Sequence, residues 1–167
     1  MNNILEIKNL KTSFPSGAKK IYAADDVSLS LPHGQMTALV GESGSGKSVT
    51  ALSALRLIQA PGRIESGEIF FKTPGHEDID ILKLAEARVR DIRGHKIAMI
   101  FQEPMTSLNP LFTVGNQIIE AIVLHQGLDK NKARQKAIDM LDRGALPIQS
   151  HASTATRTNS VVACASG

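Results

Sequence analysis

The stretch G-E-S-G-S-G-K-S at residues 41–48 decides the fold that this sequence predicts. Gly41, Gly46, Lys47 and Ser48 satisfy the pattern G-x-x-x-x-G-K-[S/T]. The glycines of this pattern allow backbone N–H groups to wrap around phosphate oxygens in conformations that larger side chains would obstruct. The sequence therefore predicts a phosphate-binding loop.

The residues on either side of the loop predict the secondary structure that such a loop needs. Residues 36–40 form a short apolar run of the buried-strand type, and apolar residues recur at helical spacing over residues 47–58. In a strand, loop, helix order, the helix N-terminus adds unpaired N–H donors and the positive end of its dipole. Lys47 is then placed to bridge the β- and γ-phosphates of a nucleotide, and the Ser48 hydroxyl to ligate Mg²⁺.

Composition restricts the remaining possibilities. The 167 residues are 42% hydrophobic and 21% charged, which predicts one soluble domain or part of one. The net charge of +3 comes from basic residues scattered among acids, so we expect no nucleic-acid partner. The single cysteine, Cys164, allows no internal disulfide and provides no metal-ligand spacing. Because no run approaches the roughly 18 apolar residues of a membrane span, we expect a cytoplasmic chain that meets a membrane only through a partner.

The rest of the chain predicts an α/β fold. Alternation of apolar and polar residues indicates strands at 4–10 and 27–31 around an exposed turn at 15–20. Further along the chain, the patterns predict a strand at 67–71, a charged amphipathic helix at 81–93, a buried-type strand at 96–101, and helices at 114–125 and 129–143.

Three longer stretches carry a resemblance to a known family. They are V-G-E-S-G-S-G-K-S-V-T-A-L-S at 40–53, S-G-E-I-F-F at 66–71 and R-G-H-K-I-A-M-I-F-Q-E-P-M-T-S-L-N-P at 93–110. From about residue 4 to Arg143, the chain resembles the ATP-binding subunit of an ATP-binding cassette (ABC) transporter. The wording F-Q-E-P-M-x-S-L-N-P is similar to that of the oligopeptide and dipeptide importers, particularly the YejF type. The resemblance implies the N-terminal portion of a P-loop nucleotide-binding domain, namely an antiparallel β-region, the P-loop core and the start of a helical subdomain.

The resemblance also implies roles for individual residues. Gln102 matches the Q-loop glutamine, which in the family contacts Mg²⁺ and the attacking water and relays the nucleotide state to the permease. Phe14 lies where the family places the aromatic ring that stacks on adenine; Tyr22 is an alternative, and either ring could instead serve packing. Mg²⁺ would be held by Ser48 and Gln102. The residues expected to bind ATP are Phe14, Gly41, Glu42, Ser43, Gly44, Ser45, Gly46, Lys47, Ser48 and Val49.

Partners and location follow from the same resemblance. Family members dock on transmembrane permease subunits, pair with a second ATP-binding subunit, and receive cargo indirectly from a substrate-binding protein. The helices at 114–143 resemble the subdomain that receives the permease, although their apolar stripes could equally be internal packing. We therefore expect a peripheral protein on the inner face of the cytoplasmic membrane.

The final residues have a different character. From residue 144 to 167 the chain is rich in Ser, Thr and Ala, and Arg157 is its one charged residue. After Arg143 we find no signature loop, no strand ending in Asp-Glu and no switch histidine, so we do not expect this chain alone to hydrolyse ATP. Permitted codon choices in the next reading frame spell the family's S-G-G-M-R-Q-R segment. We therefore expect residues 1–143 to be a partial ABC domain and 144–167 to be an out-of-frame, disordered tail.

Two other classes of function remain open at this point. A small P-loop kinase or GTPase would need a second acidic metal-binding strand, which we do not find. Asn131 and Lys132 resemble the start of the guanine-reading N-K-x-D pattern, but Arg134 stands where its carboxylate belongs. The other alternative is a non-catalytic nucleotide-binding module or an inert pseudogene product.

Overall fold

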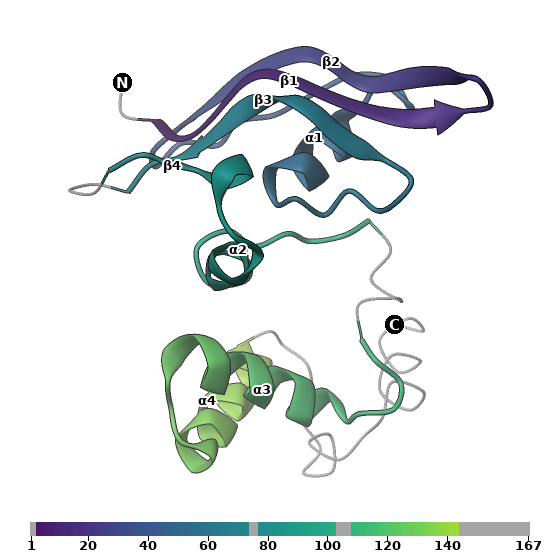
Figure 1. Cartoon of the computed structure of the whole chain (residues 1–167). Helices are drawn as coiled ribbons and strands as arrows, with labels where there is room; N and C mark the ends of the chain where they lie inside the picture. The colour runs from purple at the N-terminus through teal and green to yellow at the C-terminus, as the bar shows by residue number, and fades with distance from the viewer. Residues whose placement is uncertain (1–2, 74–76, 103–107, 144–167) are drawn as a thin grey trace. The chain divides into compact units, whose positions relative to one another are not determined.

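A computed structural model describes residues 3–73, 77–102 and 108–143 of the chain (Figure 1). The chain divides into two compact units, Met1–Arg90 and Asp91–Gly167. The first unit carries the sheet and the phosphate-binding loop, and the second carries the helices of the predicted helical subdomain. The predicted tail at 144–167 lies outside the described residues, so its disorder stays a prediction.

The first unit is built on one four-stranded sheet in which every neighbouring pair is antiparallel. The strand order is β2-β1-β3-β4. The predicted strands at 4–10, 27–31 and 67–71 are confirmed, and each is longer than the sequence indicated. Their bounds are β1 (Asn3–Ser16), β2 (Lys19–Pro32), β3 (Arg63–Phe71) and the short β4 (Ile79–Asp80).

The sheet buries alternate apolar side chains and pairs charged ones. Leu5, Ile7 and Ile69 are among its buried apolar side chains, as the period-2 pattern of a half-buried strand requires. Glu6 and Lys72, in contrast, form an ion pair at 2.8 Å. The helix α1 (Lys47–Ala54) packs against β1 and β2 and covers one face of the sheet (Figure 1).

Helix α1 is shorter than the predicted span of 47–58. It ends at Ala54, and Arg56 adopts a left-handed backbone conformation with a φ of 52°. The Arg56 guanidinium then donates to the backbone oxygen of Leu84 at 2.6 Å and lies 3.6 Å from a carboxylate oxygen of Glu86. The apolar spacing continues past the helix, but the N–H groups of Leu55, Arg56 and Leu57 bond to the oxygens of Leu52 and Ser53 in a turn that ends the α-helix.

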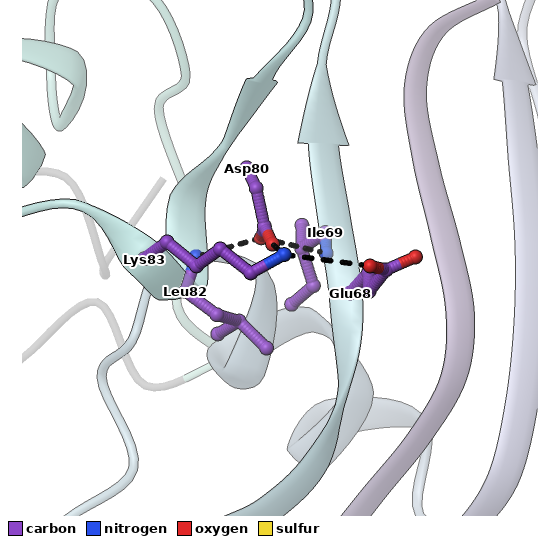
Figure 2. A network of polar contacts seen from close by, with 5 residues as sticks. All are labelled: Glu68, Ile69, Asp80, Leu82 and Lys83. Carbon is purple, nitrogen blue, oxygen red and sulfur yellow. Dashed lines mark hydrogen bonds and ion pairs between the residues drawn. The ribbon is translucent and has the colours of Figure 1, made fainter.

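The predicted helix at 81–93 is interrupted. A 3₁₀ turn, η1 (Ile81–Lys83), and a separate helix, α2 (Glu86–Ile92), take its place. Figure 2 shows the cause: one carboxylate oxygen of Asp80 accepts from the backbone N–H of Leu82 at 3.1 Å and of Ile69 at 3.3 Å. The Lys83 ammonium reaches the other oxygen of Asp80 at 2.9 Å and Glu68 at 3.4 Å. The hydrogen bond that Lys83 donates to Asp80 is the main cause that raises the pKa of Lys83.

Two predicted strands are wrong in this structure. Residues 36–40 and 96–101 are irregular, and within them Met36 is fully exposed and Ile100 is 97% exposed. A buried-type strand needs a hydrogen-bonded neighbour on each edge. In the described residues, the pairing found for these runs is an isolated parallel bridge between Arg93 and Ile97. The apolar pattern is present, but the partners that would bury it are not among the described strands.

The second unit confirms the two predicted helices at 114–125 and 129–143. They are α3 (Val114–Gln126) and α4 (Lys130–Arg143), and each begins with a side-chain cap: Thr113 accepts from Asn116 N–H, and Asp129 accepts from the N–H groups of the first turn of α4. Ile122, Ala133 and Ala137 form their buried contact. None of the helices in the described ranges has the length and hydropathy needed to span a bilayer.

Candidate phosphate-binding site

The loop at 41–46 is an exposed turn that ends at the sheet. The Ser45 N–H donates to the Glu42 oxygen at 3.2 Å, and Gly44 and Gly46 adopt positive φ values of 80° and 85°. A Cβ on Gly46 would collide with the backbone oxygen of Ala23 in β2, whereas one on Gly44 would meet open space. Gly46 is thus required both by its conformation and by its close approach to the sheet.

Lys47 places its charge over the loop. Its ammonium donates to the backbone oxygens of Gly41 at 2.7 Å and Glu42 at 2.6 Å, and to the Ser45 hydroxyl at 3.1 Å. These three acceptors account for the ammonium's three hydrogens. The side chain therefore folds back across the loop and holds a positive charge among the backbone groups of residues 41–45.

The start of α1 adds donors at the same place. The N-cap of the helix is Gly46, which has no side chain that could accept from the first N–H groups of the helix. The first turn contains no acidic residue, and Ser48 is exposed in it. Unpaired N–H groups, the dipole's positive end and a lysine together form a site whose chemistry suits a phosphate anion.

The buried hydroxyls of Thr50 and Ser53 in α1 were not predicted from the sequence. Thr50 donates from its hydroxyl to the Gly46 oxygen at 3.0 Å, and Ser53 donates to the Val49 oxygen at 2.7 Å. Both side chains are buried, as is Thr12 of β1, which lies 2.9 Å from the Ser53 hydroxyl. The available signal was the placing of Thr50 and Ser53 three positions apart, hence on one face of the helix.

The structure places Phe14 in a packed position. A Cβ on Gly62 would collide with the Phe14 ring and would lie 2.9 Å from a methyl of Ile58. Phe14 therefore covers the residues before β3 and is only partly exposed. Tyr22, its predicted alternative, pairs with Ser13 across the strands and is 48% exposed. Which ring stacks on adenine stays a prediction.

Gln102 lies in the second unit, at the exposed end of the irregular run that begins at residue 96. Residues 103–107, which continue the F-Q-E-P segment, lie outside the described residues. The structure thus brings together residues 41–49 as one continuous site. The Q-loop role of Gln102 and its contact with Mg²⁺ stay predictions.

Comparison with known proteins agrees with the fold and extends the sequence resemblance. The family model described as "ABC transporter" matches residues 24–162. A protein of Brucella melitensis biotype 1 that is named as a peptide import ATP-binding protein is 45% identical over 145 residues. The match covers 86% of this chain and 43% of that protein. The glutathione import ATP-binding protein GsiA of Shigella boydii serotype 4 is 46% identical over 146 residues, or 87% of this chain and 23% of that protein. The chain thus spans less than half the length of these relatives.

Among solved structures, the ATP-binding cassette MJ0796, in a dimeric post-hydrolysis state bound to ADP and Pi, superposes with a TM-score of 0.71. The match covers 85% of this chain and 57% of that one at 24% identity, so it bears on the fold alone. The prediction of an ABC-type nucleotide-binding fold, present in part, is confirmed, and the family match decides against a small P-loop kinase or GTPase. The chain belongs to the ABC transporter family.

Proposed function

We propose that the chain is part of the ATP-binding component of an ABC-type peptide importer and that it binds ATP through residues 41–49. The observation that carries this proposal is the position of Lys47, whose ammonium lies over the loop at the N-terminus of α1. The peptide and glutathione import names of the relatives support the importer class. Peptides, among which glutathione is a small example, are the proposed cargo.

Mg²⁺ would enter this site together with the nucleotide. Mg²⁺ prefers oxygen ligands in octahedral geometry and is commonly shared between protein groups and phosphates. We propose the Ser48 hydroxyl, exposed in the first turn of α1, as one ligand and the Gln102 amide oxygen as another. The ion would neutralise phosphate charge that Lys47 alone does not balance.

The proposed partners are those of an importer. Transmembrane permease subunits and a second ATP-binding subunit would complete the assembly at the inner face of the membrane, and a substrate-binding protein would deliver cargo. The pair of helices α3 and α4 is the proposed docking element for the permease. Its exposed Leu124 and Met140 give it apolar surface that such a partner would cover.

The direct test is titration of the purified chain with a fluorescent ATP analogue in the presence of Mg²⁺. Lys47→Ala should weaken binding by about tenfold or more, because the charge-assisted bonds to the phosphates are lost. Lys19→Ala, a lysine at the exposed start of β2, is the matched control and should bind like the parent chain. Equal affinities of the two variants would contradict the assignment of the loop.

Turnover is measured separately, because phosphoryl transfer needs positioning groups that residues 41–49 do not supply. Binding without release of phosphate supports a nucleotide-binding part, and absence of both supports the inert product. Hydrolysis by the chain alone would contradict the expectation from the sequence. We also propose that residues 144–167 are out of frame. The match of the family model extends into these residues, to residue 162, so it does not itself support this proposal. Reading the gene's next frame after Arg143 tests it directly.

A further inference from the structure

We propose that the buried hydroxyl pair of Thr12 and Ser53 positions the phosphate-binding loop, so that it sets nucleotide affinity without touching the nucleotide. This inference rests on the proposed function of residues 41–49. Its starting point is the burial of polar side chains in the described residues. Four are buried, Thr12, Ser13, Thr50 and Ser53, and all four lie on α1 or on the β1 segment beside it.

The direction of the hydrogen bonds links the sheet to the first turn of α1. The Ser53 hydroxyl donates its single proton to the Val49 oxygen at 2.7 Å. Thr12 therefore donates to Ser53, whose oxygen it meets at 2.9 Å. Both side chains are fully buried, with 0% exposure. The chain of bonds runs from β1 through two hydroxyls to the backbone oxygen of Val49, the last residue of the proposed site.

The buried apolar side chains of this helix lie at its C-terminal end, where Ala54 and the C-cap Leu55 are buried. The buried residues of the eight-residue α1 are Thr50, Ser53 and Ala54, which are small and mostly polar. Small side chains provide little apolar area, and apolar contact is non-directional, so it tolerates small shifts of a helix along a sheet. A hydrogen bond between buried hydroxyls does not, because a shift leaves both groups desolvated and unpaired. The pair therefore selects one position of α1 on β1.

The selected position is transmitted to the loop by two further contacts. Gly46 accepts from both the N–H of Thr50 at 2.8 Å and its hydroxyl at 3.0 Å, which ties the N-cap to the first turn. Gly46 also lies close against Ala23 of β2. The N–H groups that would bind phosphate follow directly at Lys47 and Ser48. A small displacement of α1 would therefore misdirect donors whose strength depends on alignment.

The test compares variants of the full chain by titration with a fluorescent ATP analogue and by thermal unfolding. Thr12→Val keeps the shape of the side chain but removes the donor, and should weaken ATP binding by about three- to tenfold, the range of one net hydrogen bond. Thr12→Ser restores the donor and should restore the affinity. Ser28→Ala is the matched control, since the Ser28 hydroxyl accepts from the Asn9 N–H within the sheet, away from α1.

A second variant keeps the proposal testable if Thr12→Val does not fold. Ser53→Ala removes the acceptor while retaining a good helix former, and the double variant should lose no more affinity than either single one. Amide hydrogen exchange adds a readout independent of nucleotide: exchange of the Thr50 N–H, which is bonded to the Gly46 oxygen, should quicken in Thr12→Val and not in Ser28→Ala.

The outcomes separate the two proposals. If the parent chain binds no ATP, the proposed function fails and this inference fails with it. If the parent chain binds and folded Thr12→Val or Ser53→Ala binds equally well, the positioning role is overturned while the proposed function stands. Loss of affinity in proportion to lost thermal stability, with Ser28→Ala following the same line, would also overturn it. Loss in Thr12→Val with recovery in Thr12→Ser, against an unchanged Ser28→Ala, supports it.

Discussion

The antiparallel sheet and the two apolar runs at 36–40 and 96–101 are made of similar residues but have opposite environments. Ile69 of β3 is fully buried, and Ile100 of the second run is 97% exposed. β1 finds its partner β2 across a tight turn, at Gly17 and Ala18, and its second partner β3 only after the loop and α1. The two runs have the strand pattern without a ladder in the described residues.

The difference shows that an apolar pattern indicates that a segment can form a strand. It does not by itself show that the segment is buried. Antiparallel strands can be joined by a short loop, as β1 and β2 are. A strand buried on both faces belongs to a parallel sheet, whose neighbours arrive through long crossover connections. The environment of such a strand is therefore decided entirely by distant residues, while the pairing of β1 with β2 is decided locally.

The largest effect expected from this contrast is in stability, and a matched pair of isoleucines measures it. Ile69→Ala removes a buried side chain and leaves a cavity, so the free energy of unfolding should fall by about 2–5 kcal/mol. Ile100→Ala removes a side chain that water already surrounds, and the change should stay within about 0.5 kcal/mol. Urea denaturation of both variants provides the comparison.

Two controls make the isoleucine pair decisive. Ile69→Val, which removes a single methylene, should cost about 0.5–1.5 kcal/mol and so fall between the two. A large loss in Ile100→Ala would mean that the second run is buried in solution, and the proposed contrast between the regions would then be wrong.

The same contrast explains how much of the fold the sequence could predict. The alternation of Leu5 and Ile7 and the helical spacing around Ile122 are local signals, and both elements formed as expected. The helix at 81–93 was misplaced because the Asp80 carboxylate caps a new turn, a tertiary arrangement that also uses the N–H of Ile69. The short strand β4 carries no periodicity at two residues and left no signal.

The candidate site was predictable for a different reason. Its glycines and Lys47 are required by backbone geometry and charge at one place in the chain, so a local pattern contains most of the information. The hydroxyls of Thr12 and Ser53 were not predictable, because 41 residues separate them and their contact exists only once α1 lies on β1. The phosphate-binding pattern could therefore be predicted from the sequence, whereas the hydroxyl contact between α1 and β1 could not.

The phosphate-binding loop at 41–46 follows the first apolar run and lies against β2 at Gly46. A matched pair of glycines in this loop tests that contact. Gly44→Ala and Gly46→Ala both force alanine into the left-handed region, at a cost of roughly 1–2 kcal/mol each. The alanine at 46 would also meet the Ala23 oxygen of β2, and overpacking of this kind adds about 1–3 kcal/mol. Thermal unfolding should therefore rank Gly46→Ala as clearly the less stable variant.

ATP titration of the same glycine pair gives a second ranking. Gly46→Ala should weaken binding more than Gly44→Ala, because displacement of residue 46 moves the N-cap of α1 itself. Equal stability of the two variants would show that the loop does not lie against β2, and the close approach of Gly46 to Ala23 would be refuted.

The smallest expected effect concerns pH and a polar contact between Lys20 of β2, Ser13 of β1 and Glu65 of β3. Glu65 accepts from the Lys20 ammonium at 2.8 Å and from the buried Ser13 hydroxyl at 2.6 Å. The hydrogen bond from Lys20, followed by that from Ser13, lowers the pKa of Glu65 below its ordinary value of 4.5. Because the folded pKa is the lower one, this contact stabilises the fold above pH 4.5 and stops doing so as the pH falls through the folded value.

Glu65→Gln tests this by keeping an acceptor for both donors while removing the charge that titrates. The parent chain should be the more stable of the two near pH 6, and the difference should shrink as the pH falls below 4.5, because the protonated carboxyl then resembles the amide. Lys20→Met should reduce the same pH dependence while leaving the Ser13 bond in place. A stability difference that is constant between pH 6 and pH 3, measured by urea denaturation, would show that the charge of Glu65 contributes nothing. The Lys20–Glu65 ion pair would then have no measurable share in the stability of the sheet.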